Sequence, residues 1–398
     1  MRNRWFKDIP QQVWLLGVVS FFADLSSELV YPIIPLFLTV TLGAPVAAVG
    51  ITEGVAEATA NLTRLFSGRW SDRVRARKPF VVAGYGLAAL GKAVLCVAPV
   101  WGFALAGRAI DRFGKGIRSA PRDALLSDYS TPENRGRVFG FHRSMDSAGA
   151  VGGPLIGLTF LALAGDHLRI AIALAVIPGL LSVLALRTVE ERPAPTPSAG
   201  ATLPGLRSLP RAYWLALFAT GLFMAGNSSD AFLLLRAKDI GLGATLVVLG
   251  YVLYNTIYTL GAYPAGVLSD HVPRPLLLCA GYAVFAAVYF GFALAGERWV
   301  VWPLMATYGL YIAATDGVTK ALIADLSPGS LRSSAMGLFQ GVTGLTALFA
   351  SVAAGVLWDQ IDPSAPFYLG AVCAVSAAGV LAVLAATGAL SLPKSAAA

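Results

Sequence analysis

Long apolar runs limit what this chain can fold into more than any other feature of its sequence. A helix needs about 20 apolar residues to cross the roughly 30 Å hydrocarbon core of a bilayer. Runs near that length occur at about 12–38, 46–70, 80–98, 101–123, 137–164 and 168–187, and again at 211–236, 244–268, 275–296, 299–325, 332–358 and 365–391. Hydrophobic residues make up 56% of the 398 residues and charged residues only 13%, too little polar surface for a soluble protein. The sequence predicts an all-α polytopic membrane protein with twelve transmembrane helices.

A polar, proline-rich break separates the runs into two sets of six. We predict an N-terminal six-helix bundle at 1–187, a flexible linker at 188–210 and a C-terminal six-helix bundle at 211–398. Most Lys and Arg residues between the runs fall on one side, which the positive-inside rule makes cytoplasmic. Both termini and the linker are therefore expected in the cytoplasm, in a multi-pass protein of the cytoplasmic (inner) membrane. The first run carries Asp24 and Glu28 and is expected to be a retained helix rather than a signal peptide.

Several functional classes lack their signatures in this sequence. The net charge of +8 fits basic membrane loops better than nucleic-acid binding. The three Cys and three His residues are scattered, without disulfide or metal-ligand spacing. The motifs H-E-x-x-H and G-x-S-x-G and the P-loop that binds ATP are absent from the sequence. No enzyme, metal, cofactor or ATP site is expected, and the chain is expected to work as a monomer.

The two halves repeat each other. FSGRWSDRV at 66–74 corresponds to YPAGVLSDHV at 263–272, which matches Gly68 with Gly266 and Asp72 with Asp270. Further along, LLSDYSTPENRGRVFG corresponds to LIADLSPGSLRSSAMG, which matches Asp128 with Asp325, Arg135 with Arg332 and Gly140 with Gly337. Two pseudo-symmetric six-helix bundles with a site between them are the usual layout of a secondary transporter.

The loop after the second run resembles a motif of the major facilitator superfamily. Residues 68–78, GRWSDRVRARK, are similar to G-x-L-x-D-R-x-G-R-K, except that Arg75 stands at the second glycine position. The resemblance covers the chain from Gln12 to about Leu390. It implies that Gly68, Asp72 and Arg73 belong to a cytoplasmic gate. We expect the same gate to include further charged residues, namely Arg118, Arg122, Asp128, Arg135 and Asp270.

Two further motifs favour one branch of that family, the drug or metabolite:proton antiporters that work in efflux. Residues 112–120, RFGKGIRSA, resemble R-x-x-Q-G-x-G-A-A, which implies a role in proton transfer for Arg112. Residues 149–158 resemble the antiporter motif G-x-x-x-G-P-x-x-G-G at Gly149, Gly153, Pro154 and Gly157, with Leu158 in place of the last glycine. The alternative is a small-residue seam for ordinary helix packing.

Charged residues recur at helical spacing inside the apolar runs of the N-terminal half. Each costs at least about 2.5 kcal/mol at mid-membrane, so they must face a polar cavity or one another. The expected proton-coupling and central-cavity residues are Asp24, Glu28, Glu53, Glu57, Arg108, Asp111, Arg112 and Lys115. Asp24 or Glu28 is expected to exchange the proton. The alternative is a set of static salt bridges between helices. Lys92 is expected to extend toward the membrane surface.

The C-terminal half has fewer charged residues in its apolar runs. Its candidate substrate contacts are Asp230, Tyr254, Asn255, Tyr258, Asp316 and Lys320. Asp230 is the repeat counterpart of Glu28, and Lys320 can neutralise Asp316 one helical turn away. Aromatic residues at this spacing are otherwise typical of helix packing.

Together these features favour proton-coupled export of a small organic molecule through the membrane. The basic stripe at 108–122 suits an anionic or zwitterionic substrate such as a siderophore, whereas the acids of the first helix suit lipophilic cationic drugs. Proton-coupled uptake is the alternative transport mode. A non-transporting receptor and a membrane-embedded enzyme are the alternatives from other classes.

Overall fold

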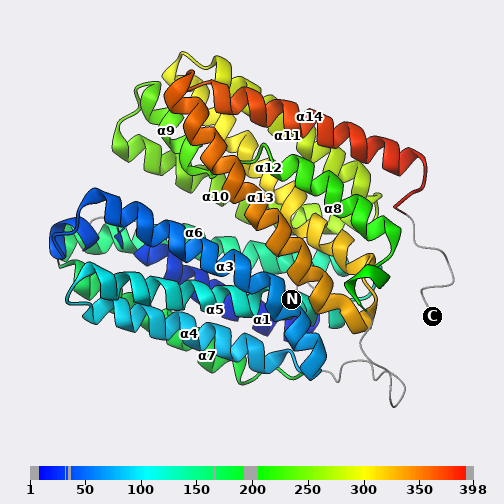
Figure 1. Ribbon diagram of the computed structural model, residues 1–398, viewed down its shortest axis with the longest axis horizontal. Coiled ribbons are helices and arrows are strands. Elements are labelled where there is room, and N and C mark those ends of the chain that lie inside the picture. Colours follow the sequence, from blue (N-terminus) through cyan, green and yellow to red (C-terminus); the bar gives the residue numbers. More distant parts are fainter. Residues whose placement is uncertain (1–8, 32, 35–36, 165–166, 192–204, 391–398) are drawn as a thin grey trace, which may run out of the picture. The chain divides into compact units, whose positions relative to one another are not determined.

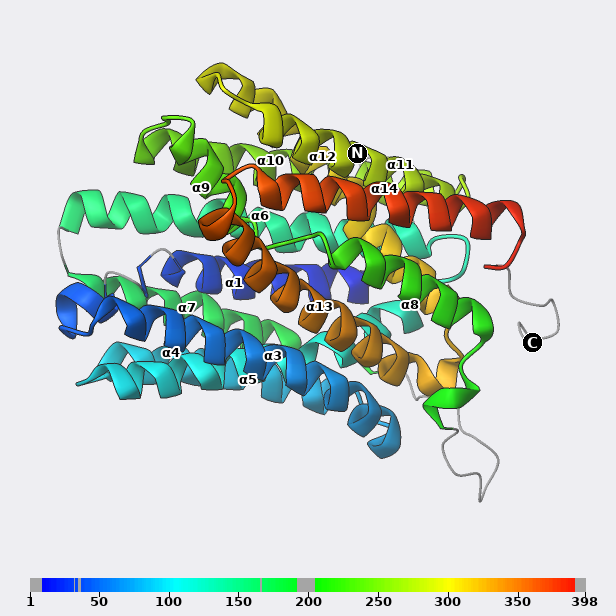
Figure 2. The same cartoon turned by 45° about the horizontal axis from the view of Figure 1, so that its top comes forward.

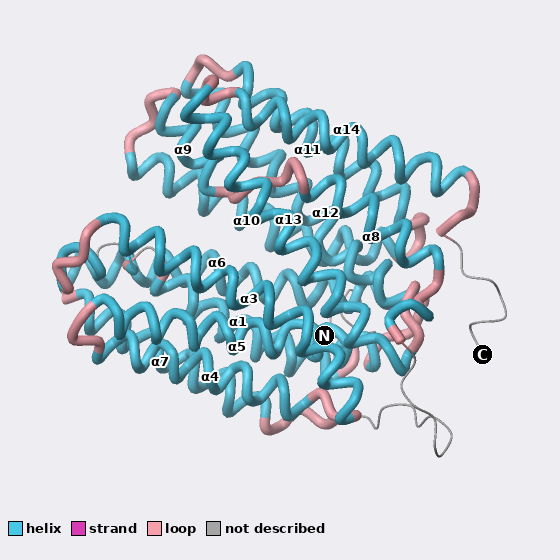
Figure 3. The backbone as a smooth tube through the Cα atoms, viewed as in Figure 1, coloured by secondary structure: helices cyan, strands magenta, loops and turns pink. Residues whose placement is uncertain are grey.

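The computed structural model describes residues 9–31, 33–34, 37–164, 167–191 and 205–390 (Figure 1). Both chain ends and residues 192–204 of the predicted linker lie outside these ranges. Figure 3 shows helices and connecting loops and no strand in the described part of the chain. This confirms the predicted all-α fold class.

The α-helices follow the predicted apolar runs closely. In the first half they are α1 (Gln11–Val30), α3 (Val46–Val74), α4 (Lys78–Val97), α5 (Trp101–Asp128), α6 (Arg135–Ala164) and α7 (Leu168–Leu186). In the second half they are α8 (Arg211–Met224), α9 (Ala231–Asp239), α10 (Ala244–Ser269), α11 (Arg274–Leu294), α12 (Val301–Asp325), α13 (Arg332–Gln360) and α14 (Ala365–Ala386). Prolines immediately precede α1, α3, α8 and α11, where a residue without an N–H and with a fixed φ starts a helix without cost.

Two predicted runs are not single helices. The run at 211–236 is interrupted between α8 and α9, where Gly226, Asn227, Ser228 and Ser229 are all weaker helix formers than the apolar residues around them. The run at 12–38 ends its α-helix at Val30, shortly before two prolines, and a short π-helix follows at Phe37–Thr41. Periodicity alone did not locate either interruption.

Six helical segments of the described residues are both long and apolar enough to cross a membrane. They are Gln11–Val30, Lys78–Val97, Leu168–Leu186, Arg274–Leu294, Gly329–Gln360 and Ala365–Ala386. Helices α3 and α5 have 29 and 28 residues, which is long enough, but they carry more ionisable side chains. Helix α6, with 30 residues, likewise carries Arg137, Arg143 and Asp146, so the ionisable groups of the first half are most frequent on α3, α5 and α6.

The chain forms two compact units, each of which takes a short segment from the other half of the sequence. The first unit comprises residues 1–131, 145–203 and 329–341. In it α4 and α5 run side by side (Figure 2), and glycines allow the close approach: a Cβ at Gly91 would lie 2.5 Å from the Gly107 carbonyl oxygen. Ser26 of α1 donates a hydrogen bond to the Ala175 carbonyl of α7 over 2.6 Å.

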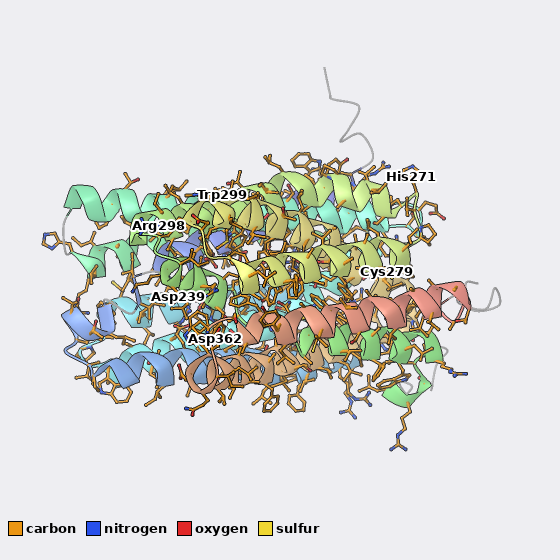
Figure 4. The ribbon with its side chains drawn as sticks, turned by 90° about the horizontal axis from the view of Figure 1, so that it is seen from above. Asp239, His271, Cys279, Arg298, Trp299 and Asp362 are labelled. Carbon is orange, nitrogen blue, oxygen red and sulfur yellow. The ribbon has the colours of Figure 1, made fainter. Side chains whose placement is uncertain are left out.

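The second unit comprises residues 132–144, 204–328 and 342–398. Its core is aromatic: Phe223 stacks on Tyr282 at 4.0 Å between ring centroids, and Phe285 stacks on Tyr289 at 3.9 Å. Figure 4 shows that Asp239, Arg298, Trp299 and Asp362 lie toward one end of this unit, and His271 and Cys279 toward the other.

At the first of these ends, Asp362 accepts hydrogen bonds from the N–H and the hydroxyl of Ser364. These hydrogen bonds lower the pKa of the Asp362 carboxyl.

Candidate functional site

An ion network joins α3, α4 and α5 in the first unit. Arg108 makes two hydrogen bonds to Glu53, of 2.8 and 2.9 Å, and a third of 3.2 Å to Asp111. Lys92 of α4 meets Asp111 at 2.9 Å. Lys92 is only 3% exposed, so the expectation that it extends to the membrane surface is wrong. A buried ammonium needs a carboxylate partner, and Asp111 lies one helix away.

Two acids of α1 face the glycines of the predicted antiporter motif. A Cβ on Gly149 of α6 would lie 3.1 Å from the Asp24 Cβ, and one on Gly153 would lie 2.8 Å from the Glu28 Cβ. Gly157 lies one turn further along, against Leu29, and Pro154 is buried within α6. The motif glycines thus bring α6 against the turns of α1 that carry its carboxylates.

The basic stripe of α5 lies among these acids. Asp24 interacts electrostatically with Lys115 and Arg118, and Arg112 with Glu28, Glu53, Glu57 and Asp111. Arg118 lies over the ring of Tyr85, 4.3 Å from its centroid, in a cation–π contact. The structure thus brings together the predicted coupling residues of α1, α3 and α5, with Glu57 exposed and the arginines buried.

A second polar network in the first unit includes the start of α13. Asp146 of α6 accepts a hydrogen bond from Ser20 of α1 and lies 3.9 Å from Arg122. Arg122 also contacts Asp123, whose other oxygen accepts a 2.7 Å hydrogen bond from Gln340. The network therefore links α1, α5, α6 and α13.

The motif at 68–78, predicted to be a loop, begins inside α3, whose last turns carry Gly68 and Asp72 and contact the N-terminus of α13. Asp72 accepts hydrogen bonds from the N–H of Ser334, at 2.6 Å, and from its hydroxyl, at 2.7 Å. A Cβ on Gly68 would collide with the Ser333 carbonyl, so only glycine fits here. A carboxylate at a helix N-terminus is stabilised by the exposed N–H groups and by the helix dipole.

The repeat counterpart in the second unit has the same geometry. Asp270 accepts hydrogen bonds from the N–H groups of Gly136, at 2.7 Å, and Arg137, at 3.0 Å, in the first turn of α6. Gly266 lies against Gly140 as Gly68 lies against Gly337. Burial raises the pKa of Asp270, and these N–H donors and Arg274 oppose that shift. The repeated sequence motifs thus specify the same local contact twice.

Beside each of these two aspartate–helix contacts, that of Asp72 and that of Asp270, a second aspartate pairs with two arginines. In the first unit Asp128 pairs with Arg77 and with Arg332, the latter at 3.1 Å. In the second unit Asp325 pairs with Arg274 and Arg135. Burial lowers the pKa of Arg77 and of Arg135 to about 10, which leaves both guanidinium groups charged at neutral pH.

Sequence reasoning missed Arg77 and Arg274 in these clusters. The motif directed attention to Arg73, which is exposed, whereas Arg77 is 3% exposed and lies 3.9 Å from Asp72. The alignment of the two repeats could have identified both arginines, because Arg77 follows Asp72, and Arg274 follows Asp270, within a few residues. Arg75, at the glycine position of the motif, has φ 58°, a left-handed conformation that explains the preference for glycine.

The candidate residues of the second half form two groups. Asp316 of α12 meets Lys320 at 2.9 Å, Arg143 at 3.4 Å and the Tyr258 hydroxyl at 2.6 Å. Asp230, before α9, accepts hydrogen bonds from the hydroxyls of Tyr308, at 2.6 Å, and Tyr254, at 3.0 Å.

The other candidates of this half lie in the surrounding helices. Asn255 is buried and donates to the Tyr251 carbonyl within α10. Tyr308 and Arg143, which the candidate substrate contacts did not include, complete the two groups. No cluster of His, Cys, Asp and Glu in the described residues could hold a metal ion.

Comparison with known proteins identifies the class. The Major Facilitator Superfamily profile matches residues 16–317 and 217–396, so the chain belongs to this family of membrane transporters. An uncharacterized MFS-type transporter of Methanocaldococcus jannaschii is 36% identical over 93% of this chain and 94% of its own length. The multidrug resistance protein MdtH of Aeromonas hydrophila is 26% identical over 87% of each chain.

Solved structures share the fold at low sequence identity. The Escherichia coli fucose:proton symporter FucP has a TM-score of 0.80 at 14% identity, covering 93% of this chain and 98% of that one. The human organic anion transporter MFSD10 has a TM-score of 0.75 at 14% identity, covering 94% and 100%. The chain is thus a multi-pass membrane transporter with the fold of this superfamily.

Proposed function

We propose that this chain is a secondary active transporter that exports a small organic molecule in exchange for protons, by alternating access. The observation that carries the proposal is the position of Asp24 and Glu28, packed against Gly149 and Gly153 of the antiporter motif. The carboxyl groups of Asp24 and Glu28 can take up and release a proton within the membrane, whereas the arginines of α5 stay charged. The similarity to a multidrug resistance protein supports export of drug-like molecules.

In this proposal the residues divide into coupling and gating groups. Lys115 and Arg118 of α5 interact electrostatically with Asp24, and Arg112 interacts with Glu28. The two arginines stay charged throughout the transport cycle, and the carboxyl groups exchange the proton. The acids Asp72 and Asp270, each at a helix N-terminus, hold the cytoplasmic gate together with Asp128 and Asp325. The chain acts as a monomer of two six-helix bundles, with both termini on the cytoplasmic side of the inner membrane.

Everted membrane vesicles with an acid interior and a pH-sensitive dye test this proposal. Organic cations and organic anions are added one at a time to the wild type, to Asp24→Asn and to a control, Glu297→Gln, whose carboxylate lies in an exposed loop. We expect a substrate to release protons from vesicles with the wild type and the control, and not from vesicles with Asp24→Asn. Equal proton release from Asp24→Asn vesicles would remove Asp24 from the mechanism.

A further inference from the structure

The last three turns of α3 present one exposed face. With about 100° between successive residues of an α-helix, positions 62, 66, 69, 70 and 73 fall within about 100° of the helix circumference. All five side chains on this α3 face are exposed: Leu62, Phe66, Arg69, Trp70 and Arg73. Leu62, Phe66 and Trp70 are 49%, 68% and 60% exposed, so large apolar surface is available beside the two arginines.

The α3 face changes from apolar to basic along the helix. The two aliphatic and phenyl side chains come first, and the two arginines follow in the last turns. Trp70 lies between the arginines and packs edge to face against Phe80 of α4, with 5.7 Å between the ring centroids. In membrane proteins Trp is enriched at the level of the lipid headgroups. The order of side chains along the face therefore matches the order of acyl chain and headgroup in a phospholipid.

The protein supplies no carboxylate for the arginines at this end of α3. Within the described ranges the side chains of Arg69, Arg73 and Arg75 have neither an ion pair nor a hydrogen bond, and all three are exposed. Asp72, next to Arg73 in the sequence, is 7% exposed and accepts hydrogen bonds from Ser334 instead. A guanidinium group offers a planar set of donors that fits phosphate oxygens. An anionic phosphate group is thus a fitting partner for this surface.

The apolar part of the α3 face favours a lipid over a soluble anion. A free phosphate would contact the arginines alone and leave the neighbouring apolar side chains unused. A phospholipid contacts both parts, because its acyl chains lie in the hydrocarbon and its phosphate lies at the membrane surface. Basic residues at that surface attract anionic lipids in particular.

We propose that the α3 face is a binding site for an anionic phospholipid. The headgroup and phosphate contact Arg69 and Arg73, Trp70 lies at the level of the headgroup, and an acyl chain lies along Phe66 and Leu62. This site goes beyond the proposed export function and does not depend on it, because it requires neither a substrate nor a proton gradient.

Quenching of Trp70 by brominated phospholipids tests the site on the full-length protein in vesicles. Dibrominated phosphatidylglycerol or dibrominated phosphatidylcholine replaces a rising fraction of dioleoylphosphatidylcholine, and bromine quenches an indole that touches the labelled chain. The chain has eight Trp residues, so the Trp70 signal is the difference between each protein and its own Trp70→Phe form. We expect the relative binding constant at Trp70 to favour phosphatidylglycerol at least about fivefold, the effect of one basic residue at an anionic surface.

Two double variants separate a site from diffuse attraction. Arg69→Gln/Arg73→Gln should reduce the preference for phosphatidylglycerol to about onefold, with quenching by phosphatidylcholine retained. The control Arg207→Gln/Arg211→Gln removes the same charge from two exposed positions of the second unit and should keep the preference. Arg69→Gln alone is the further variant if the first double variant does not fold, and it should lower the preference at least about twofold.

Three results would overturn the lipid site. The first is equal quenching of Trp70 by the two brominated lipids in the wild type. The second is an unchanged preference in Arg69→Gln/Arg73→Gln or, if that variant does not fold, in Arg69→Gln. The third is an equal loss of preference in the Arg207→Gln/Arg211→Gln control, which would assign the preference to the net charge of the protein.

Discussion

Replacing Asp111 by Asn should destabilise the first unit more than replacing its partner Lys92 by Met. Asp111 lies between two buried cations, Lys92 at 2.9 Å and Arg108 at 3.2 Å. Their side chains are 4% and 2% exposed, so water cannot replace the lost carboxylate. Arg108 retains its two hydrogen bonds to Glu53, but no other carboxylate is recorded for Lys92 in the described residues.

The distances set the expected magnitudes. At an effective dielectric constant of about 20, each of these contacts contributes about 5–6 kcal/mol of attraction, most of it offset by the cost of burying the charges. Removing the carboxylate leaves the buried Lys92 ammonium without its recorded carboxylate partner, a loss of about 3–5 kcal/mol in the free energy of unfolding. Lys92→Met should cost only about 1–2 kcal/mol, because Asp111 keeps Arg108 and the Met side chain fills the space of the lysine stem.

Denaturant unfolding in detergent micelles, followed by tryptophan fluorescence, measures these free energies. The double variant Lys92→Met/Asp111→Asn removes both buried charges of the pair and should be at least about 2 kcal/mol more stable than the sum of the single effects predicts. Additive effects, or equal costs for the two single variants, would show that the pair is not a buried ion pair of this kind.

Three further predictions concern the motifs. In Gly153→Val even the Cβ would lie 2.7 Å from the Leu29 nitrogen, so we expect about 3 kcal/mol or more of destabilisation and loss of transport. A normal thermal midpoint would contradict this packing. Arg75→Gly relieves the left-handed backbone and should raise the thermal midpoint, by a gain of about 0.5–1 kcal/mol, and a lower midpoint would speak against strain there. Asp270→Asn loses charge-assisted hydrogen bonds to the first turn of α6 and should cost about 2 kcal/mol in the same unfolding assay; a change below about 0.5 kcal/mol would mean that the charge contributes nothing.

Much of the fold was predictable because its signals are local. The length of each apolar run predicted most of the helices without knowledge of their partners. The break at 225–230 was missed because the hydropathy of 211–236 stays high across it, and a single glycine followed by polar residues does not by itself end a helix.

The repeats predicted which motif residues correspond, and the structure gives the corresponding residues matching contacts. Asp72 and Asp270, matched by sequence, each accept an N–H from the first residues of a helix. The repeat could not show that those helices are α13 and α6, because the N–H groups of a helix start carry no sequence signal of their own.

Apolar run length, internal repeats and motif resemblance were enough to predict a helical membrane transporter with acids and bases at helical spacing on α1, α3 and α5. Hydrocarbon thickness and the helical repeat act on each segment separately, so a linear reading suffices. The partners of these side chains became visible in the folded chain: Lys92 pairs with Asp111, 19 residues away, Asp230 with Tyr308, 78 away, and Ser334 with Asp72, 262 away. Such pairs depend on which face each helix turns toward its neighbours. That orientation is set by the small residues at which several helices pack at the same time, so no single segment specifies it.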